Sequence, residues 1–184
     1  ILIYIWQNIS MNMKNVYLVG FMGCGKTNLA KKIAKNLKLN FIDTDFEIEN
    51  KHSNSINNIF KYKGEEFFRK EETKLIKEIA KFNNRIIATG GGLPCKNNNF
   101  DLLQKSGIII YLKYSKHNLF KQLVKSSNKR PLIKDLNKNE LKKYIEITLD
   151  KRETTYKKSN KVISCDYLSE KEILREINSF ITSF

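Results

Sequence analysis

The stretch GFMGCGKT, residues 20–27, decides the fold because it separates a short apolar run from a helical pattern. The apolar run is VYLV at residues 16–19, and after the stretch Leu29, Ile33 and Leu37 recur every fourth residue. The stretch fits the pattern G-x-x-x-x-G-K-[ST], in which glycines let the backbone wrap around phosphate groups. We therefore expect a buried strand, a phosphate-binding turn and a helix N-terminus in that order, which is the context that the pattern requires.

The residue types of this loop predict a site for the phosphates of a nucleotide. Backbone amides and the helix dipole supply positive potential, Lys26 can reach the β and γ phosphates, and Thr27 offers a hydroxyl to Mg²⁺. A purely structural glycine-rich turn is the alternative. The loop alone does not separate kinases from GTPases, motor ATPases or translocases. The expected nucleotide contacts are Gly23, Cys24, Gly25, Lys26, Thr27 and Asn28.

Four further runs predict the rest of a sheet, at residues 41–42, 85–89, 108–112 and, more weakly, 161–164. These runs are continuously apolar rather than alternating, so the strands should be buried on both faces. We therefore expect an α/β fold of three layers, in which helices flank a five-stranded parallel sheet.

The end of the chain predicts one more helix, which docks on the sheet. A capping box, Ser169-x-x-Glu172, precedes an apolar face that begins at Ile173 and continues to Phe184. No internal repeat and no linker rich in Pro, Gly or Ser divides the chain, so one domain is expected.

Length and composition agree with a single globular domain. The 184 residues are 41% hydrophobic with 2 Pro and 8 Gly, which excludes collagen-like and wholly disordered chains. The net charge of +15 would attract a polyanion, but the many lysines suggest a coding bias that spreads lysine over solvated surfaces. Three separated cysteines predict reduced thiols in a reducing compartment, and the isolated His52 and His117 are expected to be inert.

An acidic segment lies where the second strand should end. Asp43 and Asp45 are two residues apart at the expected carboxyl end of that strand, the edge at which open α/β sheets bind ligands. One carboxylate beside Mg²⁺ and the other beside an acceptor hydroxyl would serve phosphoryl transfer. The alternative for Asp45 is that it only caps the next helix.

Two further segments are expected at the same edge. Gly90, Gly91 and Gly92 follow the third strand and would let a substrate approach backbone amides, although a plain flexible turn is the alternative. Arg152 falls on the inward stripe of a helix at about residues 138–156 and needs an anionic partner, either a bound carboxylate or an internal acid. Arg69 is less clear, because neighbouring glutamates can pair with it on a helix surface.

The segment at residues 126–138 has no clear period and lies in a strongly basic part of the chain. It would suit a cationic flap that closes over phosphates, with Arg130 arriving on closure. A disordered polar loop is the alternative.

Together these motifs resemble the shikimate kinase family in their order and spacing, from about residue 16 to residue 181. They are GFMGCGKT, DTD at residues 43–45, GExxFRxxE at residues 64–72, the three glycines, RPL at residues 130–132 and KRxxxY at residues 151–156. The one departure near the site is Asn28, which stands where a hydroxyl residue commonly follows the threonine of the loop.

The resemblance implies a P-loop fold like that of the nucleoside monophosphate kinases, with a lid, and transfer of a phosphoryl group from ATP to shikimate with Mg²⁺. It implies that Lys26, Asp45 and Arg130 are catalytic, that Arg130 also contacts ATP, and that Asp43 and Thr27 serve the metal. The shikimate contacts that it implies are Asp45, Arg69, Gly90, Gly91, Gly92 and Arg152.

The domain plan that follows has a kinase domain at residues 14–184 and an N-terminal extension at residues 1–13, a vestige of upstream sequence. Within the domain, the substrate-binding subregion spans about residues 45–75 and the lid about residues 126–138. We expect a cytoplasmic monomer with no nucleic-acid or membrane partner. Two alternatives stay open: another P-loop kinase of small molecules, such as gluconate kinase, and a nucleic-acid-binding ATPase.

Overall fold

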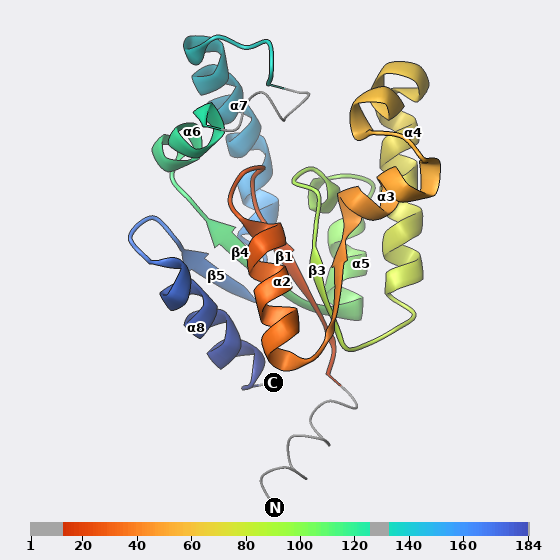
Figure 1. Ribbon diagram of the computed structural model, residues 1–184, viewed down its shortest axis with the longest axis vertical. Helices are drawn as coiled ribbons and strands as arrows, with labels where there is room; N and C mark the ends of the chain where they lie inside the picture. The colour runs from red at the N-terminus through yellow and green to blue at the C-terminus, as the bar shows by residue number, and fades with distance from the viewer. Residues whose placement is uncertain (1–12, 126–132, 184) are drawn as a thin grey trace, which may run out of the picture.

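The computed structural model describes residues 13–125 and 133–183, and its centre is one parallel sheet (Figure 1). The five strands lie in the order β2-β3-β1-β4-β5, and every pairing is parallel. The predicted fold class is confirmed. The strands are β1 (Asn15–Val19), β2 (Asn40–Asp43), β3 (Arg85–Ala88), β4 (Gly107–Lys113) and β5 (Lys161–Ser164).

Helices connect the strands and cover the sheet on both sides. In Figure 1, α2 and α8 lie in front of the sheet, and α5 and α7 lie behind it. The helices are α2 (Lys26–Leu37), α3 (Thr44–His52), α4 (Ile56–Ile79), α5 (Asn99–Ser106), α6 (Lys116–Val124), α7 (Lys138–Tyr156) and α8 (Glu170–Ile181), with a short 3₁₀ turn η1 (Leu93–Cys95).

The main core lies in the middle of the sheet. Strands β1, β3 and β4 are almost wholly buried, whereas the edge strands β2 and β5 are partly exposed. The expectation of burial on both faces therefore holds for the central strands only, because an edge strand has a neighbour on one side. Helix α8 begins with the predicted capping box of Ser169 and Glu172 and buries Ile173.

A second, smaller core lies between α3 and α4. Its buried members are Ile48 from α3 and Ile59 and Phe68 from α4. Helix α4 is interrupted at Gly64, whose φ of 80° and ψ of 166° are not helical. The two helices thus pack as a unit with its own apolar centre, within the segment predicted to bind substrate.

The predicted lid is described only at its end. Residues 126–132, which include Arg130, lie outside the described residues, as do residues 1–12 of the predicted extension. Ile133 is buried in the main core, and Asn137 caps α7 through a capping box with Glu140.

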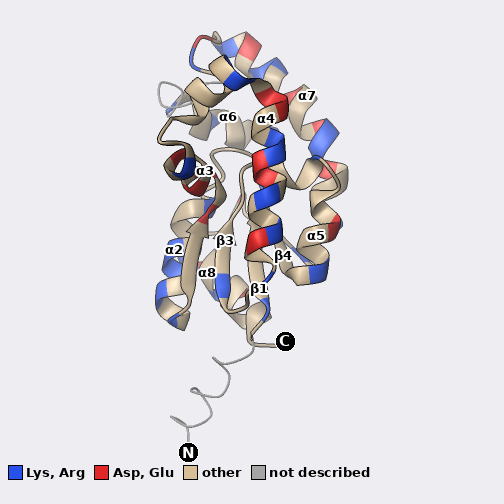
Figure 2. Ribbon diagram, turned by 90° about the vertical axis from the view of Figure 1, so that its right-hand side faces the viewer, with Lys and Arg blue, Asp and Glu red and all other residues tan. Residues whose placement is uncertain are grey.

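Charged residues are interleaved along the helices. Figure 2 shows basic and acidic residues alternating along α4. Several of them form ion pairs within that helix, such as Lys70 with Glu66 and Lys74 with Glu71. Within residues 13–125 and 133–183, none of the helices has the length and apolar character needed to span a membrane.

Candidate active site

Three loops meet at the carboxyl ends of β1, β2 and β3. The Gly90 amide after β3 donates a hydrogen bond to Thr44 Oγ1 after β2, at 2.8 Å. A Cβ added to Gly91 would lie only 3.2 Å from the Met22 amide nitrogen in the loop after β1. The predicted convergence at one sheet edge is therefore present, and it depends on glycines that leave room for neighbouring backbone.

The phosphate loop has the backbone conformation that its glycines permit. Gly20, Gly23 and Gly25 all have positive φ, and Gly25 immediately precedes α2. Lys26 is buried, and its Nζ donates to the carbonyl oxygens of Gly20 and Phe21, both at 2.9 Å. The ammonium charge therefore lies within the loop, beside the helix N-terminus that attracts anions.

Asp43 links the phosphate loop to α3. Its Oδ2 accepts a hydrogen bond of 2.6 Å from Thr27 Oγ1, and its Oδ1 accepts from the amides of Asp45 and Phe46. Asp43 is thus the N-cap of α3, and the alternative that Asp45 serves as this cap is wrong.

The oxygens of Thr27 and Asp43 are of the hard type that Mg²⁺ prefers. Across residues 13–125 and 133–183, no three His, Cys, Asp or Glu side chains gather as a metal site. Mg²⁺ at this position would therefore need oxygens from a nucleotide and from water in addition to those of the protein.

Asp45 is partly buried and faces the glycine loop. A Cβ added to Gly90 would collide with Asp45 Oδ1, so only glycine allows the two segments to come this close. Burial raises the pKa of Asp45 to about 6, with a further increase from Asp43 and an opposing effect of Lys26. A carboxyl group with this pKa can gain or lose a proton near neutral pH, as a proton acceptor in catalysis must.

Arg69 pairs with both neighbouring glutamates and also faces the glycine loop. Its Nη1 lies 2.8 Å from Glu72 Oε2, and its Nη2 lies 2.9 Å from Glu65 Oε1. A Cβ added to Gly92 would lie 2.8 Å from Arg69 Nη1. Arg69 therefore pairs with glutamates on its own helix, as the alternative predicted, and also lies next to the glycine loop.

Glu72 is a member of the site that the sequence does not reveal as one. Its side chain is 1% exposed, whereas that of Glu65 is 53% exposed, although both flank Arg69 on the same helix. Burial raises the pKa of Glu72, which Arg69 opposes and nearby Asp45 reinforces. The spacing of Arg69 and Glu72 indicates a pair, but only the packing of α4 shows that this carboxylate is buried beside Asp45.

Arg152 lies on the inward stripe of α7, as its position in the helical pattern predicts. It is half-buried, its guanidinium lies 5.9 Å from the centre of the Phe21 ring, and its Nη1 is 3.5 Å from the position that a Gly91 Cβ would take. No ion pair of Arg152 with a carboxylate is found among the described residues, but its charge opposes the rise in the pKa of buried Glu72, so the alternative of an internal acid is met in part. A cation in this position favours an anionic ligand.

Tyr156 contacts the glycine loop through a hydrogen bond. Its side chain is fully buried, its hydroxyl donates to the Gly91 carbonyl oxygen, and its ring packs on Tyr111 with centroids 5.0 Å apart. Burial raises the pKa of Tyr156, and the nearby charge of Arg152 opposes this rise. The predicted motif at residues 151–156 thus places both an arginine and a tyrosine beside the glycine loop.

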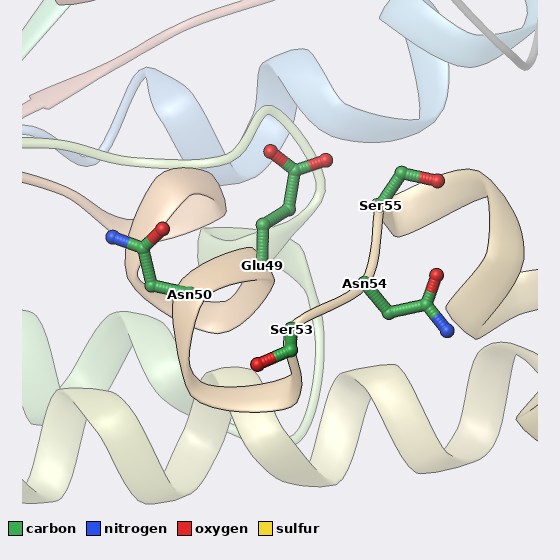
Figure 3. Close-up of a pocket in the computed structure, with 5 residues that line it drawn as sticks. All are labelled: Glu49, Asn50, Ser53, Asn54 and Ser55. Atoms are coloured by element: carbon green, nitrogen blue, oxygen red, sulfur yellow. The ribbon is translucent and has the colours of Figure 1, made fainter.

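A surface pocket lies at the other end of α3 from Asp45. Figure 3 shows its lining side chains, and none is among the predicted site residues. The Glu49 carboxylate accepts a hydrogen bond from the Ile56 amide, which ties it to the start of α4. The lining residues are Glu49, Asn50, Ser53, Asn54 and Ser55.

The strand order, the phosphate loop at the start of α2 and the nearby acids and arginines are those of a P-loop kinase, an ATP-dependent phosphotransferase. Comparison with known proteins identifies the family within this class. The sequence model described as shikimate kinase matches residues 22–182, and the chain belongs to the shikimate kinase family.

Individual relatives agree with this membership. A shikimate kinase of Azobacteroides pseudotrichonymphae is 39% identical over 166 residues, covering 90% of this chain and 98% of the relative. The solved shikimate kinase of Acinetobacter baumannii, in complex with shikimate, is 28% identical with a TM-score of 0.87 and covers 97% of each chain. A gluconokinase of Sinorhizobium meliloti, 14% identical with a TM-score of 0.54 over 92% of each chain, shares the fold alone.

The hydrogen bond from Tyr156 to Gly91 should stabilise the folded protein measurably. We expect Tyr156→Phe to lower the free energy of unfolding by about 0.5–1.5 kcal/mol, because it leaves the partly buried Gly91 carbonyl oxygen without its donor. Urea denaturation measures the change. Tyr167→Phe is the matched control, since Tyr167 is 99% exposed and should be neutral; equal effects of the two substitutions would contradict the assignment.

Proposed function

We propose that this chain transfers the γ-phosphoryl group of ATP to the 3-hydroxyl of shikimate, releasing ADP and shikimate 3-phosphate. The observation that carries the proposal is the convergence of Asp45, Arg69 and Arg152 on the glycine loop beside the phosphate loop. Membership of the shikimate kinase family and the shikimate bound to the Acinetobacter baumannii relative support the choice of acceptor.

The two arginines bind the carboxylate of shikimate. Arg152 lacks a carboxylate partner among the described residues, so it contributes a full positive charge to the acceptor site. Arg69 is held by buried Glu72 and by exposed Glu65, and exchange of the exposed partner for the ligand costs little. Planar guanidinium groups can bind a carboxylate through two parallel hydrogen bonds, which fixes the orientation of the acceptor ring.

Asp45 orients the ring hydroxyls and accepts the proton of the attacking one. The hydroxyl oxygen bonds to the γ-phosphorus, the bond from that phosphorus to the oxygen of ADP breaks, and the proton goes to the Asp45 carboxylate. Gly90, Gly91 and Gly92 line the site through their backbone and let Asp45 and Arg69 lie close to it. Positioning of the hydroxyl in line with the phosphorus supplies much of the rate acceleration.

The phosphate loop binds the other substrate. Lys26 exchanges its hydrogen bonds to the Gly20 and Phe21 carbonyls for phosphate oxygens, while the amides of residues 23–28 bind the same phosphates. Thr27 and Asp43 would hold Mg²⁺, which when bound neutralises phosphate charge. Arg130, which lies outside the described residues, would contribute a further positive charge from the lid.

We further propose that the protein acts as a monomer in the cytoplasm with no nucleic-acid or membrane partner. Two of its three unpaired cysteines are buried, Cys24 in the phosphate loop and Cys165 after β5, as suits a reducing compartment. The alternation of basic and acidic residues on α4 supports the absence of a nucleic-acid groove there.

A coupled assay of ADP release tests the function directly. We expect rapid release with ATP and shikimate together, and only background release with ATP alone, with ATP and gluconate, or with ATP and RNA. Release stimulated by gluconate or by RNA, but not by shikimate, would support the corresponding alternative and overturn the proposal.

Replacement of the proton acceptor should stop turnover without loss of nucleotide binding. We expect Asp45→Asn to lower kcat by about 10²–10⁴-fold, because an amide cannot accept the proton. The dissociation constant for ATP, measured by calorimetric titration, should stay within about twofold. Turnover near the unsubstituted rate would show that Asp45 is not the acceptor.

The raised pKa of Asp45 predicts a pH dependence of known sign. The reactive form is the deprotonated carboxylate, so kcat/KM for shikimate should fall as the pH drops below about 6 and level off above it. The measurement is kcat/KM at saturating ATP from about pH 5 to pH 8. A flat profile across this range is the result that contradicts the prediction.

The geometry of Arg152 predicts a loss that is specific for the acceptor. We expect Arg152→Lys to raise the KM for shikimate by about tenfold or more, because an ammonium cannot make the two parallel hydrogen bonds. The KM for ATP should change by less than about twofold. Arg175→Lys on the exposed side of α8 is the control for the exchange itself; equal increases for both substrates in Arg152→Lys would indicate a structural role.

A further inference from the structure

A cluster of charged side chains lies on the face of α4 that is turned toward the end of α3. At its centre is Glu71, whose side chain is only 4% exposed. The Glu71 carboxylate lies 3.1 Å from Lys51 Nζ, 3.0 Å from His52 Nε2 and 2.7 Å from Lys74 Nζ. His52 is more shielded than an isolated surface histidine would be, since its side chain is 16% exposed and lies against Glu71.

The ionisation state of Glu71 determines whether His52 donates or accepts the hydrogen bond between them. Hydrogen bonds from Lys74, and then from His52 and Lys51, lower the pKa of Glu71 to about 2 despite its burial. The group is therefore an ionised carboxylate at neutral pH, which can only accept hydrogen bonds. His52 Nε2 must carry the hydrogen that it shares with Glu71.

The three partners of Glu71 differ in the helix they come from and in how far they are shielded from solvent. Lys74 lies on α4 itself, three residues from Glu71, and is 62% exposed. Lys51 comes from α3 but is 49% exposed, so its ion pair contributes little. His52 comes from α3 and is well shielded, so its contact with Glu71 is the link between the two helices. Its ring also packs edge-on against the Phe67 ring of α4, with the ring centroids 5.3 Å apart.

The two helices joined by this link carry residues of the acceptor site. Asp45 lies in the first turn of α3 and His52 in its last turn, about 10 Å further along the axis. On α4, Glu71 lies between Arg69 and Glu72 in the sequence. Arg69 and Glu72 pair with each other, whereas the Glu71 carboxylate contacts His52 of α3. A shift of α3 against α4 would therefore change the separation of Asp45 and Arg69.

The hydrogen bond between His52 and Glu71 adds to a small apolar contact between α3 and α4. The core between α3 and α4 has three buried members, Ile48, Ile59 and Phe68, and is separate from the main core. The first turn of α3 is held to the sheet by the bond from the Gly90 amide to Thr44 Oγ1. Near the last turn of α3, Glu49 accepts a hydrogen bond from the Ile56 amide of α4 and His52 contacts Glu71, so this end of α3 is held by α4.

We propose that His52 is a positioning residue for the acceptor, because its hydrogen bond to Glu71 fixes α3 against α4 and thereby sets Asp45 relative to Arg69. This inference rests on the proposed function, since shikimate is the acceptor whose binding it concerns. Nucleotide binding should depend little on the link, because the phosphate loop is continuous with β1 and α2 and contacts α3 only near its first turn, through Asp43.

The test compares two variants that each remove one partner of Glu71. His52→Phe keeps an aromatic ring against Phe67 but removes the hydrogen-bond donor, and Lys74→Ala removes a partner that does not cross between helices. We expect His52→Phe to raise the KM for shikimate roughly five- to twentyfold with the KM for ATP within about twofold, and Lys74→Ala to leave both within about twofold. His52→Gln, whose amide nitrogen can also donate, should restore most of the shikimate KM.

The outcomes separate the two proposals. If the unsubstituted protein releases no ADP with shikimate, the proposed function fails whatever the variants do. If it is active, an unchanged shikimate KM in His52→Phe, equal losses for both substrates, or the same loss in Lys74→Ala overturns the role of His52. Should His52→Phe not fold, His52→Ala replaces it, and the same difference between shikimate and ATP is expected.

Discussion

Gly90, Gly91 and Gly92 let neighbouring groups approach the loop after β3 closely, and the arrangement of the site follows from this contact. Each glycine faces a different neighbour: Asp45 at the start of α3, the Met22 amide of the phosphate loop, and the guanidinium of Arg69 on α4. A side chain at any of these positions would push one of those neighbours away. The loop after the central strand β3 thus brings the phosphate site and the acceptor site together.

The two arginines of the site differ in whether a carboxylate pairs with them. The carboxylates of Asp45 and Glu72 face the guanidinium groups of Arg69 and Arg152, and burial raises the pKa of both acids. Arg69 is restrained by Glu72, whereas Arg152 has no carboxylate partner among residues 13–125 and 133–183. An anionic acceptor can supply the carboxylate partner that Arg152 lacks.

The helices that carry the proposed acceptor residues share a smaller apolar core than the elements that carry the phosphate loop. The phosphate loop connects two elements of the main core, β1 and α2. Helices α3 and α4 pack instead through three buried apolar residues and through the contact of His52 with Glu71. Modest changes at the α3–α4 contact should therefore affect the acceptor before they affect ATP, since apolar burial supplies most of the stability of packed helices.

Local patterns in the sequence were enough to predict the phosphate loop, the central strands, the helix at residues 138–156 and the capping box of Ser169. These features follow from periodicity and turn chemistry within a few residues. Four other features appear only in the folded chain: Asp43 caps α3, Glu72 is buried, Tyr156 donates to Gly91 and His52 contacts Glu71. Such contacts depend on how distant elements pack, because burial and partners are properties of the assembled layers and not of the residue type.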